Sequence, residues 1–199
     1  MITIAKKKTK KSGALVLVIL LVIVAIGTAA VFMIAMRPPP RPDEAIAEFT
    51  AIDLESLRDE LLALDMEHDY PVDPEDVMRL FNQTFWLIYN WDMDDTYTIL
   101  RVLQVQRELY SQALYDLNPI NRQLSRLLFS IEEQHRARLE LIGIHQGQPV
   151  PDRFNPQDRA TISIIRYMMG GQSFHYDFHM FKRPDSGRWE IGFWVETVQ

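Results

Sequence analysis

The feature that most constrains this chain is an uncharged, strongly apolar stretch of 24 residues, which runs from Gly13 to Met36. As an α-helix it would be about 36 Å long, at a rise of about 1.5 Å per residue. The hydrocarbon core of a bilayer is about 30 Å thick, so the stretch predicts a tilted transmembrane helix. A cleaved signal peptide is the alternative, but its apolar region would be only about 7–15 residues long. The sequence therefore predicts an uncleaved anchor at residues 13–36.

Charges on the two sides of the predicted span indicate its orientation. Residues 1–12 form a basic tail with five lysines, whereas Arg37 and Arg41 flank the other end. Because an excess of Lys and Arg stays in the cytoplasm, we expect the N-terminus inside the cell and residues 43–199 outside it. The chain would then be a single-pass protein of the cell membrane. The Pro-rich residues 37–42 would form a short, stiff linker, since consecutive prolines hold an extended conformation.

The composition beyond the basic tail excludes several classes of function. After residue 12 the chain carries 16 basic and 27 acidic residues, a net charge of −11. A body this acidic is not a general nucleic-acid binder, which needs clustered Lys and Arg. The sequence contains no cysteine, which excludes disulfides, thiolate metal centres and a cysteine nucleophile. No cofactor is expected.

The acidic residues concentrate in residues 43–95, where 16 acids stand against only two arginines. We interpret this segment as a solvated surface that keeps the domain soluble and away from anionic lipid. A cation site is the alternative, because Asp92, Asp94 and Asp95 resemble the start of a calcium-binding loop. The later glycine and the closing glutamate of such a loop are missing, however. Asp94 is better explained as the N-cap of a helix.

The first part of the predicted outer domain, residues 43–137, is expected to be helical. Apolar residues recur there at helical spacing in four runs. The capping residues or breaks that precede these runs are Asp53, Asp73, Asp94 and Asn118-Pro119. The third helix is expected to run unbroken to Leu117.

The second part, residues 138–199, is expected to be an antiparallel sheet, because the apolar period changes from 3.6 to 2. Gly170-Gly171 predicts a two-residue hairpin turn, and residues 184–187 predict a four-residue turn. The last strand is expected from Trp189 to Glu196. The loop at residues 146–160 is longer than usual, which suits either a lid or an ordinary surface loop.

The two predicted turns together give a register in which one face of the sheet is apolar. A slip of one residue would exchange the two faces, so this register is a sharp prediction. We expect the helices to cover the apolar face, whose members are Ser163, Ile165, Tyr167, Phe174, Tyr176, Phe178, Met180, Ile191, Phe193 and Val195. In this register Tyr176 lies beside Ile165 and Val195, and Phe178 lies beside Phe193.

The opposite face would carry a row of three polar residues, Arg166, His175 and Glu196, with Asp177 and His179 nearby. Alternate residues of a strand are about 6.8 Å apart and could share a metal ion, whereas His175 and His179, about 13 Å apart, could not. A metal site and a catalytic His–Glu pair are therefore alternatives to a structural ladder that holds the strands in register. We favour the ladder. No catalytic residue and no metal ligand is predicted, and the ligand-binding residues are not identified.

Several segments resemble a family of uncharacterised bacterial proteins with one N-terminal transmembrane helix. They are Asp69–Val77, Leu80–Asn82, Asn118-Pro119 and Arg183–Ile191. That family has no assigned activity, so the resemblance implies no functional residues. Helices followed by a bent antiparallel sheet over residues 70–199 also resemble the cone-shaped α+β fold of nuclear-transport-factor-two-like (cystatin-like) domains. The plan of an anchor followed by a domain is similar to that of bitopic type IV secretion assembly proteins.

These observations favour a membrane-anchored extracytoplasmic binding or assembly module of the cell envelope, without catalytic activity. Its partner would be another envelope protein or a small apolar ligand, and its oligomeric state stays open. The alternative is an enzyme of the isomerase or dehydratase type that uses a pocket between helices and sheet. Such an enzyme needs a proton-transferring group beside its substrate. A buried Asp, Glu or His with polar neighbours on the pocket wall would distinguish the two.

Overall fold

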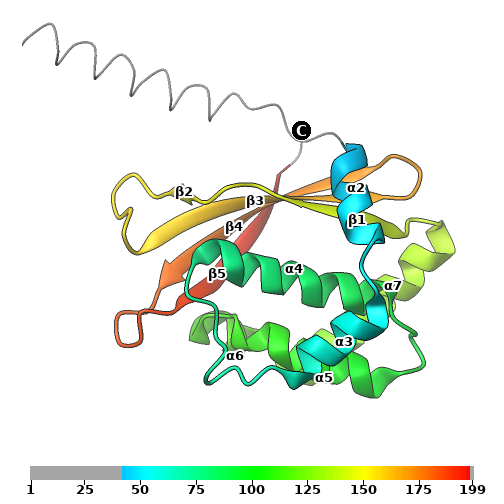
Figure 1. Cartoon of the computed structure of the whole chain (residues 1–199), viewed down its shortest axis with the longest axis horizontal. Coiled ribbons are helices and arrows are strands. Elements are labelled where there is room, and N and C mark those ends of the chain that lie inside the picture. Colours follow the sequence, from blue (N-terminus) through cyan, green and yellow to red (C-terminus); the bar gives the residue numbers. More distant parts are fainter. Residues whose placement is uncertain (1–41, 198–199) are drawn as a thin grey trace, which may run out of the picture. The chain divides into compact units, whose positions relative to one another are not determined.

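The computed structural model of the protein describes residues 42–197. Six helices precede an antiparallel sheet in this range, and α4, α5 and α7 lie on the same side of the curved sheet (Figure 1). The helices are α2 (Pro42–Thr50), α3 (Leu54–Ala63), α4 (Pro74–Asn90), α5 (Thr96–Glu108), α6 (Gln112–Leu117) and α7 (Ile120–Ala137). The strands are β1 (Leu141–Gln146), β2 (Val150–Pro151), β3 (Arg159–Met168), β4 (Ser173–Lys182) and β5 (Trp189–Thr197). The predicted α+β class, with helices packed on an antiparallel sheet, is confirmed.

Residues 42–197 all belong to one compact unit. None of the helices between residues 42 and 197 is both long and apolar enough to cross a membrane. The span predicted at residues 13–36, the basic tail and most of the linker lie outside the described residues.

Short polar side chains begin several of these helices. The Asp53 carboxylate accepts hydrogen bonds from the Glu55 backbone N–H (3.2 Å) and the Ser56 hydroxyl (2.7 Å), as a helix cap does. Asp73 stands at the corresponding position of α4, but its side chain makes no capping bond. The cap of α5 is Asp95 rather than the predicted Asp94.

The long third helix of the prediction is broken into α5 and α6. Between them, residues 109–111 run along the edge of β5. The Ile191 N–H donates to the Leu109 carbonyl (2.8 Å), and the Ser111 N–H donates to the Ile191 carbonyl (2.9 Å). The Ser111 hydroxyl then accepts a bond from the Leu114 N–H (3.4 Å) and begins α6. The break thus exchanges helical hydrogen bonds for bonds to an otherwise unpaired strand edge.

The sheet has the strand order β1-β3-β4-β5, and β2 pairs with β3 beside this path. The long loop predicted at residues 146–160 therefore contains a strand. Val150 pairs with Thr161, and Pro151 pairs with Ala160. This pairing ties the middle of the segment to the sheet.

The hairpin between β3 and β4 differs by one residue from the prediction. The Met168 N–H donates to the Gln172 carbonyl (2.9 Å), so the loop has three residues, 169–171, rather than two. Both Gly170 and Gly171 have positive φ angles, 89° and 84°. As a result Ile164 pairs with Tyr176. The face of β3 that contacts the helices is therefore the opposite of the predicted one.

The hairpin between β4 and β5 confirms the four-residue turn at residues 184–187, and Met180 pairs with Ile191 as predicted. Beyond that pair the register shifts, because Gly192 is an extra residue in β5. Phe178 therefore pairs with Trp194 instead of Phe193. Phe193 and Val195 lie on the outer face, where they are 45% and 48% exposed. The predicted positions of these two side chains were wrong.

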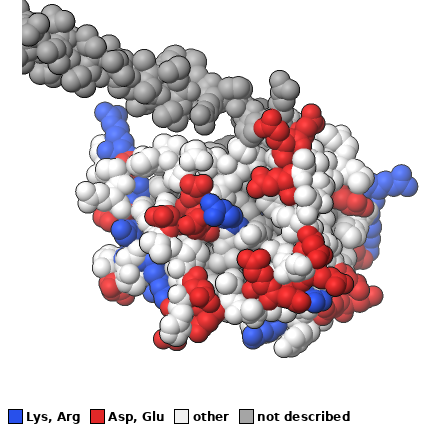
Figure 2. Space-filling model, in the orientation of Figure 1, with Lys and Arg blue, Asp and Glu red and all other residues white. Residues whose placement is uncertain are grey.

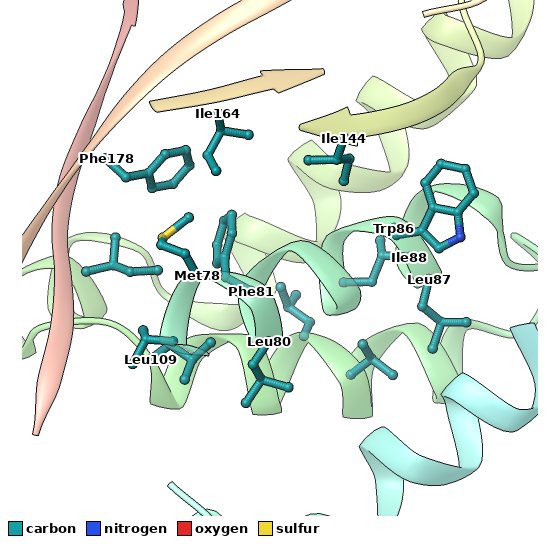
Figure 3. Close-up of a cluster of buried hydrophobic side chains, with 14 of the residues drawn as sticks. Met78, Leu80, Phe81, Trp86, Leu87, Ile88, Leu109, Ile144, Ile164 and Phe178 are labelled. Atoms are coloured by element: carbon teal, nitrogen blue, oxygen red, sulfur yellow. The ribbon is translucent and has the colours of Figure 1, made fainter. Parts of the chain in front are cut away.

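The core forms between the inner face of the sheet and α4. Five residues of β3, β4 and β5 on this face are fully buried, namely Ile162, Ile164, Phe178, Met180 and Ile191. Figure 3 shows Phe178 and Ile164 pointing toward Met78 and Phe81 of α4. The rings of Phe81 and Phe178 have centroids 5.1 Å apart. Burial of each large apolar side chain contributes about 1.5–3 kcal/mol, so this layer dominates the stability of the domain.

None of the acidic residues in residues 43–95 is buried. Figure 2 shows Asp and Glu side chains gathered over α2, α3 and the beginning of α4. Asp43, Glu44 and Glu48 of α2 are exposed, as are Asp59 and Glu60 of α3. The distribution agrees with the expectation of a solvated acidic face.

Candidate functional site

The structure separates the three residues of the predicted Arg166–His175–Glu196 row. Arg166 and Glu196 lie on the inner face of the sheet together with Tyr176, whereas His175 lies on the outer face. The prediction of a ladder was wrong, because the three-residue loop and the Gly192 bulge each shift a register by one residue. The consequence for Arg166 is large, since it moves from solvent to the interface with the helices.

The residues of the outer face form separate pairs instead of a common site. The Ser163 hydroxyl donates to the Asp177 carboxylate (2.6 Å). His179 Nδ1 lies 3.2 Å from the Thr161 hydroxyl, and its ring stacks on Phe193 with centroids 4.3 Å apart. Within residues 42–197, no group of three or more His, Asp or Glu side chains is placed to hold a metal ion.

The aspartates between α4 and α5 accept hydrogen bonds, mostly from backbone N–H groups. The Asp92 carboxylate accepts a bond from the Asp94 N–H (3.0 Å). The Asp95 carboxylate accepts bonds from the Thr98 N–H (3.1 Å) and the Trp91 indole N–H (3.0 Å). These bonds lower the pKa of Asp95, with the contribution of Thr98 the largest. The cluster therefore acts as a turn and a helix cap.

A cavity of about 180 Å³ lies between α4, α7 and the inner face of the sheet. We call it the Arg166 cavity. Its lining consists of Phe85 and Tyr89 from α4, Ser130 and Gln134 from α7, and Leu141, Arg166, Met168, Phe174, Tyr176 and Glu196 from the strands. Sequence reasoning missed this cavity, because the predicted register placed Arg166 on the outer face of the sheet.

The Arg166 guanidinium lies against aromatic rings. Its Cζ atom is 3.6 Å from the ring centroid of Phe85 and 4.5 Å from that of Tyr176. Phe85 in turn stacks on Tyr89, one helical turn later, with centroids 4.2 Å apart. The Tyr89 hydroxyl lies 3.4 Å from the Ser130 hydroxyl, which connects α4 to α7. Contacts between a cation and a ring face contribute about 0.5–2 kcal/mol each, so the rings hold the guanidinium in place.

The charge of Arg166 has no counter-ion among the described residues. Its Nε atom is buried and has no hydrogen-bond partner. No ion pair within residues 42–197 includes it, although Glu196 lines the same cavity. Burial lowers the pKa of Arg166, while the neighbouring Tyr176 and Tyr89 oppose this effect. The guanidinium nevertheless stays charged at neutral pH.

Arg107, which is buried whereas Arg166 is half-buried, shows how a purely structural guanidinium is satisfied in this fold. Arg107 is only 4% exposed and stacks on Tyr115, with its Cζ 4.1 Å from the ring centroid. It donates to Gln123 Oε1 (2.9 Å), to the Tyr115 carbonyl (3.3 Å) and to the Asn118 carbonyl. These bonds join the end of α5 to the beginning of α7. Arg166 has similar stacking, but its buried Nε has no acceptor among the described residues, which points to a missing partner.

A larger cavity, about 400 Å³, lies between α2, α4 and β1. Glu44, Glu48 and Arg79 are among its charged members, and Arg79 already pairs with Asp76 (2.7 Å). His145 also lines it; burial lowers the pKa of this side chain, and Glu48 opposes the effect. The cavity opens onto exposed helix faces with a mixed charge. It is a weaker candidate than the Arg166 cavity.

Comparisons with known proteins give one family match. The model of the family described as "Domain of unknown function (DUF6715)" matches residues 5–194. No curated protein and no solved structure matches the chain.

Proposed function

We propose that this chain, which belongs to the DUF6715 family, is a membrane-anchored extracytoplasmic module that binds a small ligand. The observation that carries this proposal is the Arg166 cavity. A buried polar group without a partner is uncommon in proteins and calls for an explanation such as an absent ion or ligand. Here the unpartnered Nε belongs to a charged group, and a cavity of about 180 Å³ adjoins it. The cavity favours a small molecule over a protein as the occupant.

The location is argued from the sequence. The uncharged residues 13–36 are long enough to span a bilayer, and the five lysines before them favour a cytoplasmic N-terminus. The Arg166 cavity would then face the cell envelope. We also propose that the domain has the cone-shaped, nuclear-transport-factor-two-like form of the α+β class. The packing of α4, α5 and α7 against one side of the curved sheet supports this (Figure 1).

An enzyme of the isomerase or dehydratase type is the second candidate. The lining includes one carboxylate, Glu196, as well as the hydroxyls of Tyr89 and Tyr176. Glu196 is exposed, whereas general acid–base catalysis needs a group positioned beside the substrate. Binding without turnover is therefore the favoured function. The two differ in one respect: an enzyme would convert a bound compound and lose that conversion in Glu196→Gln, whereas a binding module would leave the compound unchanged in both proteins.

Membrane topology is tested by thiol labelling, which is clean because the chain has no cysteine of its own. Ser186→Cys places a thiol in the exposed turn before β5, and Ser12→Cys places one in the basic tail. A membrane-impermeant maleimide should label position 186 in intact cells and position 12 only after permeabilisation. Labelling of position 12 alone in intact cells would contradict the proposed orientation.

Ligand binding is tested by thermal unfolding of the full-length protein in detergent micelles. A set of small neutral, anionic and cationic compounds is screened for an increase in Tm, because a ligand bound only to the folded state stabilises it. Any increase should vanish in Ser130→Phe, which fills the Arg166 cavity, and persist in Ser125→Phe on the exposed side of α7. If no compound raises Tm, the binding function is wrong.

A further inference from the structure

We propose that the ligand of the Arg166 cavity is a small organic monocarboxylate whose apolar part is about the size of a benzene ring. The inference rests on the proposed binding function and adds the chemical class of the ligand. It replaces the expectation of a purely apolar ligand, which the sequence suggested when Arg166 was placed on the outer face. Three separate observations support it: the charge of Arg166, the geometry of its hydrogen-bond donors and the size of the cavity.

The charge of Arg166 favours an anion. Arg166 is half-buried, and removing part of a cation from water costs free energy that aromatic faces compensate only in part. Within residues 42–197 no carboxylate forms an ion pair with Arg166. Glu196 lines the cavity but stays exposed. An anionic ligand would supply the missing counter-charge.

The geometry of the free donor favours a carboxylate. A guanidinium binds a planar carboxylate through two parallel N–H groups, and this arrangement is stronger than a single neutral hydrogen bond. The Nε–H of Arg166 is buried and has no partner in the protein, so it is the donor that a carboxylate in the cavity would satisfy. The rings of Phe85 and Tyr176 lie against the guanidinium, with their centroids 3.6 Å and 4.5 Å from its Cζ atom. The rings of Phe85 and Tyr176 therefore hold the Arg166 guanidinium in place for the ligand.

The rest of the lining limits the negative charge to one. Arg166 is the single cationic side chain among the described residues that line the cavity, and Glu196 would repel additional negative charge. The other polar groups are the hydroxyls of Tyr89, Ser130 and Tyr176 and the amide of Gln134. These groups suit a carboxylate oxygen or a substituent, but they do not neutralise a second charge. Inorganic phosphate is therefore a poorer fit.

The size and apolar walls define the remainder of the ligand. Phe85, Leu141, Met168 and Phe174 provide the apolar part of the lining. An apolar cavity of about 150 Å³ in a protein accepts benzene. The Arg166 cavity, at about 180 Å³, has room for a ring or a short branched chain that carries one carboxylate. Benzoate and 3-methylbutanoate are suitable probes of this class.

Binding of benzoate to the full-length protein in detergent micelles, measured by titration calorimetry, tests the proposal. Benzamide is the matched neutral probe, since it has the same ring and nearly the same shape. Arg166→Gln removes the cation, and Arg166→Lys keeps the charge but loses the planar pair of donors. Arg159→Gln is the matched control, because Arg159 lies on the same strand and over a ring, Phe181 (5.4 Å), but is exposed and outside the cavity.

We expect saturable binding of benzoate, with benzamide at least tenfold weaker. Arg166→Gln should weaken benzoate binding at least tenfold, Arg166→Lys should have an intermediate effect, and Arg159→Gln should have none. The 3-methylbutanoate and 3-methylbutanamide pair should repeat the preference for the carboxylate. If Arg166→Gln does not fold, the comparison of acid and amide on the unsubstituted protein decides the question.

Three results would overturn the inference. Benzamide could bind as tightly as benzoate, benzoate could bind equally well to folded Arg166→Gln, or inorganic phosphate could bind in preference to both carboxylates. In each case the ligand class is wrong while the binding function stands. The ligand class is also wrong, and the binding function stands, if the carboxylates do not bind but neutral or cationic compounds of the wider screen do. Failure of every compound, whatever its charge, refutes the binding function as well.

Discussion

The ring of Phe181 lies on Gly192, on the side where any other residue would carry its Cβ atom. A Cβ built at position 192 would stand 1.9 Å from the Cε2 atom of Phe181, far inside van der Waals contact. Gly192 is also the extra residue that shifts the register between β4 and β5. The contact therefore connects the identity of one glycine to the side of the sheet on which Phe193 lies.

Gly192→Ala should destabilise the domain by about 1–3 kcal/mol, the range for an overpacked site. The Phe181 ring would have to move, and the strand around the bulge would move with it. Urea unfolding monitored by tryptophan fluorescence measures the loss. The same substitution in a Phe181→Ala background is the control, because the ring is absent there and the loss should be smaller. Equal losses in the two backgrounds would show that the ring is not the cause.

Phe178→Ala should cost about 3–5 kcal/mol, because the side chain is fully buried against α4 and leaves a cavity. His179, the next residue, lies on the outer face and is only partly covered, by Phe193 and Thr161. We expect His179→Ala to cost less than about 1 kcal/mol. The free energies of unfolding of the two variants, compared under identical conditions, check the assignment of faces. Similar losses for both would contradict it.

Arg107→Met should destabilise the protein by about 1.5–3 kcal/mol or more, the range for hydrogen bonds to a charged group. The substitution keeps part of the side-chain volume but removes the donors that hold Gln123 and the carbonyls of Tyr115 and Asn118. Arg101→Met, on the exposed side of the same helix, should change stability by less than about 0.5 kcal/mol. If Arg101→Met lost as much stability as Arg107→Met, the loss would come from replacing an arginine in α5 and not from the hydrogen bonds of Arg107.

Burial lowers the pKa of His145 below its ordinary value of 6.5. A histidine of this kind binds protons more readily in the unfolded chain, so its contribution to stability is present above about pH 6.5. It is lost as the pH falls through the lowered value in the folded state. The domain should therefore lose stability on acidification from pH 7 to pH 5, and His145→Gln should lose less. His135→Gln, on the exposed end of α7, should behave like the unsubstituted protein in the same pH series of unfolding curves.

The helical part of the fold was largely predictable because its signals are local. The apolar stripe and the cap at Asp53 define α3 to within a residue, and the pair Asp73-Pro74 marks the beginning of α4. The break between α5 and α6 was not predictable in the same way. Its cause is the edge of β5, and position 191 is far away along the chain. Ser111, a good N-cap, was the one local signal of a new helix.

The sheet was harder, because its faces depend on two single-residue details. Gly170-Gly171 suits a two-residue turn, but both glycines also fit the three-residue loop that forms. The sequence of β3 does not indicate which of its faces is buried, because Ile162 and Ile164 lie on one face and Ile165 lies on the other. Placing an arginine on the inner face also contradicts the usual preference for charged residues in solvent. The candidate site was therefore out of reach of the sequence, although the sequence contained all of its residues.

The hydrogen bonds between residues 109–111 and Ile191 make the connection between α5 and α6 depend on β5. Leu109 is fully buried, and its carbonyl receives the Ile191 N–H. A chain that stops before β5 would leave this carbonyl and the Ser111 N–H without their partners in the interior. During synthesis, the connection between α5 and α6 cannot form its final hydrogen bonds until β5 has been made. A premature stop codon just before the codons of β5 should therefore be as damaging as one placed much earlier.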